Sequence, residues 1–109
     1  MNYSLKSIFL DSNHIGNKGA MAIASSLTVN TTLERLHLRG NLISNNGAIA
    51  IANGLKRHYS LHNLCTLNTL LLSRNRIDDV GTAAFEKSPT EVPMLGHIWW
   101  VRLLTTTTL

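Results

Sequence analysis

Several residue types are scarce in this sequence. Its 109 residues include one cysteine and two prolines, aromatic residues make up 6 % and charged residues 15 %. A single cysteine excludes an intramolecular disulfide and favours a reducing, cytoplasmic location over secretion. Residues 1–11 lack the charged start and long apolar core of a signal peptide. The longest apolar runs fall far short of eighteen residues, so we expect no membrane-spanning helix.

Length and net charge narrow the function classes further. A chain of this length forms one small domain at most, which excludes a large multi-domain enzyme. Ten Lys and Arg against six Asp and Glu give a net charge of +4. This balance is compatible with an acidic protein partner. It is too small and too dispersed for a basic nucleic-acid-binding tail, so we expect no nucleic-acid partner.

The sequence repeats itself. Residues 5–27 align with residues 33–55 at an offset of 28, with 11 identities in 23 positions. A third copy follows at an offset of 34, in which Leu67, Asn75 and Gly81 repeat earlier leucine, asparagine and glycine positions. A fixed period of this length indicates a stack of similar supersecondary units.

The repeat also sets the expected domain boundaries. We expect units at about 5–32 and 33–66 and a truncated unit at 67–85, which together form a repeat region over 1–85. Six extra residues, 61–66, precede the third unit, and Glu86 and Pro89 stand where the helix pattern breaks. Residues 86–109 show no repeat. We expect this tail to cap the stack, to form an interface, or to belong to no folded element.

Within each unit the hydrophobic period changes. Leu36 and Leu38 alternate with polar residues, which is typical of a strand. Four apolar positions at helical spacing follow in the same unit, and they recur in the first unit. Gly19 and Gly47 stand just before these predicted helices. Because a lone strand–helix unit cannot bury its apolar side, we predict stacked units that form a parallel sheet with helices on one face.

An asparagine follows each predicted strand, at positions 13, 41 and 75. A buried amide must be hydrogen-bonded, because leaving it unpaired is costly. We therefore predict that these three side chains bond backbone groups of their own unit and of the next one. Ligand contacts are the weaker interpretation of the same residues.

These residues resemble a known family. The pattern L-x-x-L-x-L-x-x-N-x-I, followed by G-A-x-x-I-A-x-x-L, is similar to the leucine-rich repeat. The 28-residue length and the alanine-rich helix resemble its ribonuclease-inhibitor-like subtype, which occurs in NOD-like receptors, ribonuclease inhibitors and Ran GTPase-activating proteins. The resemblance covers Leu5 to about Phe85. It implies an α/β solenoid, a short horseshoe arc with parallel strands on the concave face and helices on the convex face.

The resemblance also implies where a partner binds. Partners of this family commonly contact the variable strand residues on the concave face. Carried over to this chain, these positions are Ser7, Phe9 and Asp11, then Arg35, His37 and Arg39, then Thr69, Leu71 and Ser73. Arginines can hold carboxylates through paired hydrogen bonds, and an exposed Phe9 suits an aromatic anchor. The competing interpretations are solvated arginines and a Phe9 packed under the N-terminal segment.

Other constellations do not predict chemistry. Three residues of types that bind zinc lie close together in the sequence, His58, His62 and Cys65. No fourth ligand lies nearby, so we expect these three to be surface or turn residues. Asp78 and Asp79 are expected at a helix start, where carboxylates favour the helix dipole. No catalytic residues, cofactor, metal or small-molecule substrate are therefore predicted.

The sequence thus predicts a protein–protein interaction module that is not an enzyme. Two alternatives remain open. One is a regulator of an enzyme, similar to a GTPase activator or a nuclease inhibitor. The other is a non-autonomous fragment of a larger NOD-like receptor-type protein.

Overall fold

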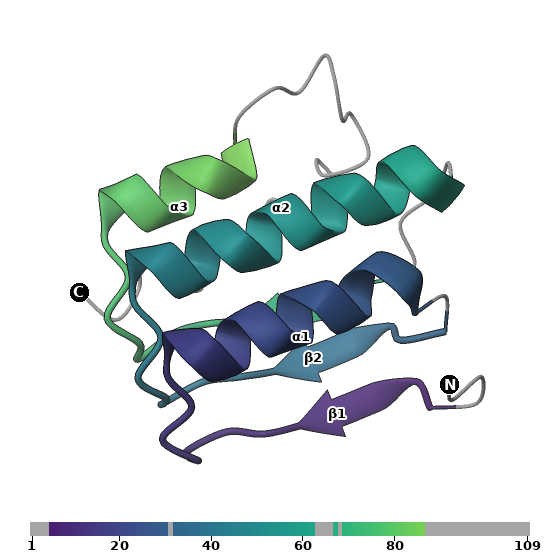
Figure 1. Ribbon diagram of the computed structural model, residues 1–109. Coiled ribbons are helices and arrows are strands. Elements are labelled where there is room, and N and C mark those ends of the chain that lie inside the picture. The colour runs from purple at the N-terminus through teal and green to yellow at the C-terminus, as the bar shows by residue number, and fades with distance from the viewer. Residues whose placement is uncertain (1–4, 31, 63–66, 68, 87–109) are drawn as a thin grey trace.

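The chain folds into one layer of strands and one layer of helices (Figure 1). The computed structural model describes residues 5–30, 32–62, 67 and 69–86. Along the chain the elements are β1 (Ser7–Phe9), α1 (Asn17–Val29), β2 (Arg35–His37), α2 (Asn45–His62), β3 (Thr69–Leu71) and α3 (Asp79–Glu86). Strands and helices alternate, as the change of hydrophobic period predicts.

The three strands form one parallel sheet in the order β1-β2-β3. Its register follows the sequence repeat, because Ile8 pairs with Leu36 and Leu36 pairs with Leu70. The predicted α/β repeat arc with a parallel sheet is confirmed. Of the predicted tail over 86–109, Glu86 is the last residue of α3, and residues 87–109 lie outside the described residues.

The core lies between the sheet and the helices. Leu36, Leu38 and Leu70 from the strand segments are at most 1 % exposed, and Ile51 and Leu55 from α2 are equally buried. The predicted helix faces are therefore the buried faces. In α1 the corresponding Ile23 is only half-buried, because its unit lies at an edge of the stack.

The asparagines that follow the strands form a ladder, in the direction opposite to the prediction. Asn41 Oδ1 accepts the backbone N–H of Asn13 (2.8 Å) and of Ile15 (2.9 Å), and its Nδ2 donates to Leu10 and Leu38 carbonyls at 3.0 Å. Each amide thus joins its own unit to the preceding one, not to the next. Asn75 acts similarly one unit later, where it accepts the Ile43 N–H at 2.9 Å and donates to the Leu38 and Leu72 carbonyls at 2.8 and 3.0 Å.

A second asparagine ladder lies at the helix starts. Asn17 Oδ1 accepts the backbone N–H of Ser44 (3.0 Å) and of Gly47 (2.9 Å), and so caps α2. Asn45 caps α3 in the same way, through the N–H groups of Asp78 (3.0 Å) and Gly81 (3.1 Å). Here the amide of one unit satisfies the free N–H groups of the next unit's helix.

This second ladder explains the repeated glycine. The helices begin at Asn17 and Asn45, so Gly19 and Gly47 lie inside the first turn, and their predicted place before the helix is wrong. A Cβ on Gly47 would lie 2.5 Å from Asn17 Oδ1. At Gly47 and Gly81 the capping amide oxygen is too close for a side chain, and at all three repeated glycines so is the isoleucine four residues earlier.

Part of the six-residue insertion extends a helix. α2 runs through Leu61 to His62, whereas α1 ends after 13 residues. His58, expected at the surface or in a turn, is 2 % exposed in α2, and its Nδ1 lies 3.0 Å from the Leu27 carbonyl oxygen. That expectation is wrong because the longer helix carries His58 across the end of α1.

Candidate interaction surface

One face of the sheet is turned away from the helices. Because side chains alternate along a strand, the residues on either side of Ile8, Leu36 and Leu70 point to this face. We call it the open sheet face; it comprises Ser7, Phe9, Arg35, His37, Thr69 and Leu71. The parallel register places these side chains in two rows across the three strands.

An aromatic pair stands at the centre of the β1–β2 part of this face. The rings of Phe9 and His37 meet edge to face, with centroids 4.4 Å apart and an interplanar angle of 89°. Phe9 is 64 % exposed, so it does not pack under other described residues. Large exposed aromatic rings held by a neighbour are favourable anchors for a partner.

The two predicted arginines differ in their contacts. Arg35 donates to Ser7 Oγ at 3.4 Å and lies 3.8 Å from Glu34 Oε1, while the other oxygen of that carboxylate, Oε2, lies 3.5 Å from Lys6 Nζ. Arg39 is exposed, and its guanidinium has no partner among the residues that the structure describes. Arg39 is therefore the cation more available to a carboxylate.

Asp11 lies beyond the end of β1 and links two units. Its Oδ1 accepts the backbone N–H of Arg39 at 2.7 Å. Next to it, a hollow of about 210 Å³ is lined by Asp11, Ser12, Arg39, Gly40 and Arg74. Arg74 thus lines this hollow together with Arg39, near the end of the open sheet face.

The prediction from the repeat missed Arg74. Ser12, Gly40 and Arg74 occupy one repeat position, and all three have left-handed backbone angles, with φ of 58°, 67° and 60°. A glycine in one copy was the available signal, because it marks a position that favours φ > 0. An arginine there is strained by about 1 kcal/mol, and it lines the hollow together with Arg39.

The β3 part of the predicted surface is less accessible. Thr69 and Leu71 are half-buried, and Ser73 is only 8 % exposed. The exposed predicted residues are therefore those of the first two units. Ser73 is too buried to contact a partner.

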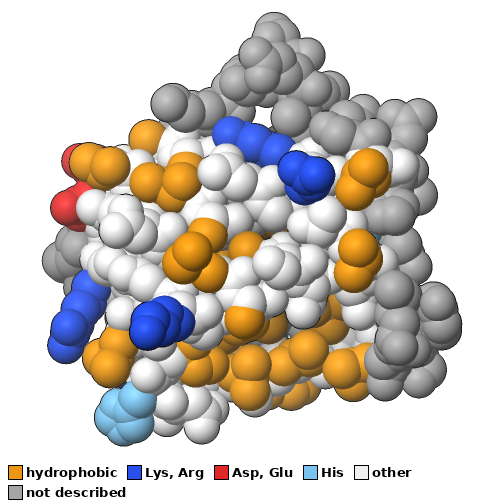
Figure 2. All heavy atoms as spheres, viewed as in Figure 1, with side chains coloured by type: hydrophobic (Ala, Val, Ile, Leu, Met, Phe, Trp, Pro, Cys, Tyr) orange, Lys and Arg blue, Asp and Glu red, His pale blue; other side chains and the backbone are white. Residues whose placement is uncertain are grey.

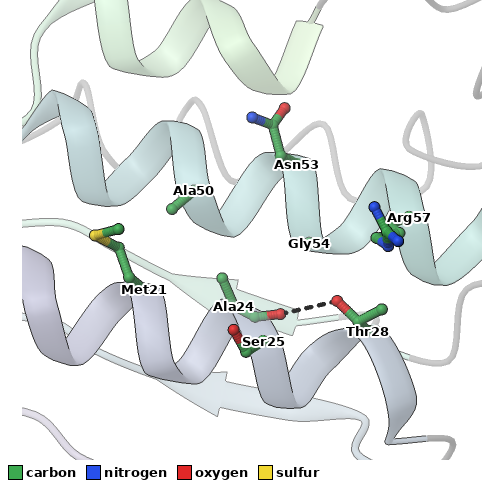
Figure 3. A pocket seen from close by; sticks show the side chains of 8 residues that line it. All are labelled: Met21, Ala24, Ser25, Thr28, Ala50, Asn53, Gly54 and Arg57. Carbon is green, nitrogen blue, oxygen red and sulfur yellow. Dashed lines mark hydrogen bonds between the residues drawn. The ribbon is translucent and has the colours of Figure 1, made fainter.

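A second hollow lies on the helical side, between α1 and α2 (Figure 3). It has a volume of about 370 Å³, and Met21 and Arg57 stand on opposite helices along it. At the bottom of this hollow, Gly54 lets α2 approach the Ala24 carbonyl, because a Cβ there would lie 2.7 Å from its oxygen. Apart from Arg57, the residues that line this hollow are uncharged. We therefore attribute the hollow to the packing of the two helices.

The remaining candidates have structural roles. Asp78 Oδ1 accepts the Val80 N–H and an Asn45 amide hydrogen, each at 2.9 Å, which confirms its place at a helix start. The described residues contain no group of three or more His, Cys, Asp or Glu that could hold a metal. Within them, too, no helix is long and apolar enough to cross a membrane. The side chains of His62 and Cys65 lie outside the described residues.

Comparison with known proteins agrees with this architecture. A family model described as Leucine Rich repeat matches three segments, residues 2–24, 29–52 and 63–85, which together cover more than half of the chain. The segments coincide with the three strand–helix units. No curated protein matches the chain.

Proposed function

Because the chain belongs to the leucine-rich repeat family, whose repeats generally mediate protein–protein interaction, we propose that it binds a protein partner on the open sheet face. The exposed Phe9 against His37 is the observation that carries this proposal. Exposing the Phe9 ring to water is unfavourable, so covering it with a partner lowers the free energy. The two asparagine ladders hold β1, which carries Phe9, rigidly against the next unit. A rigid platform loses little conformational entropy on binding.

The partner contacts this surface with acidic groups. Arg39 and Arg74 line one hollow beside the aromatic pair, and Arg35 lies on the same sheet face. The acidic side chains nearby already have partners within the chain. Asp11 accepts a backbone N–H, and Glu34 lies close to Lys6 and Arg35. Guanidinium groups beside an apolar anchor fit a peptide that carries carboxylates next to an aromatic or aliphatic side chain.

A charge-reversal pair tests this surface. We would measure fluorescence anisotropy of a labelled peptide of alternating Glu and Tyr, and compare R35E/R39E with the wild type. We expect roughly tenfold weaker binding or more, because two favourable charges become repulsive. The charge-matched control is K56E/R57E on α2, on the helical side of the molecule.

The two variants separate a specific surface from general attraction. Both lower the net charge by the same amount, so equal losses would contradict the proposal. Unchanged binding in R35E/R39E, with circular dichroism showing an intact fold, would remove this face altogether. Faster GTP hydrolysis by a small GTPase in the presence of the chain would instead favour the enzyme-regulating alternative.

We also propose the ribonuclease-inhibitor-like subtype and a reducing, cytoplasmic environment. The 28-residue spacing and full α-helices after each strand support the subtype. The single cysteine supports the environment. The proposed binding needs no cofactor, metal or small-molecule substrate.

A further inference from the structure

The hollow beside the aromatic pair lies where the strands lead into the helices. Its lining residues are Asp11, Ser12, Arg39, Gly40 and Arg74, and they come from all three units. In Figure 1 the arrows of β1 and β2 point toward this end of the molecule, and Figure 2 shows basic and acidic side chains there in the same view. The hollow is therefore a charged site at the end of the open sheet face and not an extension of the apolar core.

Three side chains in this hollow are hydrogen-bond donors without an acceptor in the described part of the chain. The guanidinium groups of Arg39 and Arg74 form no ion pair there, and the Ser12 hydroxyl forms no hydrogen bond there. All three side chains are exposed. A ligand in the hollow can therefore accept hydrogen bonds from each of the three units without displacing a contact within the described chain.

A glycine keeps the middle of this site open. Ser12, Gly40 and Arg74 occupy one repeat position, and Gly40 belongs to the central unit because β2 lies between β1 and β3. A Cβ at Gly40 would lie 3.1 Å from Ser12 Oγ. The hollow has a volume of about 210 Å³, whereas a water molecule takes about 30 Å³ in the liquid. It therefore has room for a group as large as a phosphate.

The donors and the charge of the hollow suit a phosphate ester better than a carboxylate. A phosphate ester carries a charge of roughly −1.5 to −2 at pH 7 and has three acceptor oxygens. Two guanidinium groups and a hydroxyl supply donors for all three oxygens, whereas a carboxylate has only two. Asp11 reduces the positive charge, and its Oδ1 accepts the Arg39 N–H at 2.7 Å. With two arginines and one aspartate in its lining, the hollow remains positively charged.

The hollow lies at a fixed distance from the aromatic pair. The Ser12 N–H donates to the Arg39 carbonyl at 2.8 Å, which continues the β1–β2 pairing beyond Phe9 and His37. Arg39 follows His37 by two residues, so it lies about 7 Å further along the same face. Alternate side chains of an extended peptide share one face and have this same spacing. One peptide can therefore reach both the hollow and the Phe9 ring.

We propose that the hollow binds a phosphorylated side chain of an extended peptide, and that an apolar residue two positions away in the peptide covers Phe9. Arg39 and Arg74 donate to the phosphate oxygens, and the Ser12 hydroxyl donates to a third oxygen. This inference rests on the proposed binding of a protein partner to the open sheet face, and it makes that partner a phosphoprotein. Arg74 is its distinctive residue, because the R35E/R39E pair leaves Arg74 in place.

Fluorescence anisotropy with the full chain tests the preference for phosphate. The probe is fluorescein-labelled Gly-Phe-Ala-pSer-Ala-Phe-Gly, and two comparison peptides carry Glu or Ser in place of the phosphoserine. We expect the phosphopeptide to bind at least about fivefold more tightly than the Glu peptide, because it has more charge and one more acceptor oxygen. Equal binding of these two peptides would overturn the phosphate inference and leave the proposed function standing. No binding of any peptide, the Glu and Tyr peptide included, would overturn both.

A matched pair of arginine variants tests the location of the phosphate. R74G gives the third unit the residue that the second unit has at Gly40, and it should weaken phosphopeptide binding at least about fivefold. Since R74G relieves a left-handed backbone, unfolding does not account for such a loss. R76A removes the same charge from an exposed side chain that does not line the hollow, and it should bind as the wild type does. Equal losses in R74G and R76A would indicate general charge attraction and overturn the proposal.

Removing the negative charge of Asp11 should raise the affinity. In D11N the amide oxygen can still accept the Arg39 N–H, whereas the charge that repels the phosphate is gone. We expect the phosphopeptide to bind D11N at least about threefold more tightly than the wild type, with a smaller change for the Ser peptide. Unchanged or weaker phosphopeptide binding by D11N, with circular dichroism showing an intact fold, would place the phosphate outside this hollow and refute the proposal.

Discussion

Replacing one asparagine of the first ladder measures how strongly the units are joined. Asn41 is 3 % exposed and forms four hydrogen bonds of 3.0 Å or less, two as acceptor and two as donor. Asn13 is the same residue at the same repeat position. It is exposed, and its side chain donates one bond of 3.1 Å, to the Asp11 carbonyl. N41A and N13A are therefore the same substitution in two environments.

The expected magnitudes differ severalfold. A buried backbone group left without a partner costs about 1–3 kcal/mol, and N41A strands two N–H groups and two carbonyls. Water that enters the space left by the asparagine side chain can hydrogen-bond some of these groups, which reduces the free-energy cost. We expect N41A to lower the free energy of unfolding by about 3–6 kcal/mol and N13A to lower it by less than about 1 kcal/mol. For a domain of this size, N41A removes much or all of the stability.

Urea unfolding followed by far-UV circular dichroism gives both values. With a slope of about 1.5 kcal/mol per molar urea, N41A should shift the midpoint by about 2–4 M, or be unfolded without urea. If N41A and N13A differ by less than about 1 kcal/mol, the ladder does not hold the units together.

Three further substitutions have defined expectations. G54A should lower the free energy of unfolding by about 1–2 kcal/mol in thermal unfolding, because its Cβ would lie 2.7 Å from the Ala24 carbonyl oxygen. This overpacking outweighs the gain in helix propensity. As a control, N53A at the exposed neighbouring position should be neutral or slightly stabilising. R74G should raise stability by about 1 kcal/mol, since it relieves a left-handed backbone, while weakening binding of the acidic peptide; a loss of stability would refute the strain. G40A should cost about 1–2 kcal/mol, because its φ is 67°, and an unchanged melting temperature would contradict this.

The sheet register was predictable because it depends only on the repeat. Sliding the sequence on itself pairs Ile8 with Leu36, and the same pairing holds in the structure. The helix faces were predictable for a similar reason, because apolar residues at helical spacing must face the core. The insertion before the third unit carried no such pattern, so the extension of α2 to His62 was not foreseen.

The candidate surface was only partly predictable. The alternation along β1 and β2 placed Phe9, Arg35 and His37 on the open sheet face, as the register requires. The sequence did not show that the rings of Phe9 and His37 meet edge to face or that Arg74 lines the same hollow as Arg39. Such contacts depend on side chains from different units, and a repeat alignment does not give their conformations.

By itself, the sequence determined the repeating unit, the order of strand and helix within it and the parallel stacking, because local periodicity and the need to bury leucines fix all three. Only the tertiary structure decided the direction of the asparagine ladder and the closeness of Gly47 and Gly54 to their neighbours. It also decided which of the predicted surface residues are exposed and which are half-buried or buried. These features depend on distances of a few ångströms between units, and only the packed backbone sets such distances.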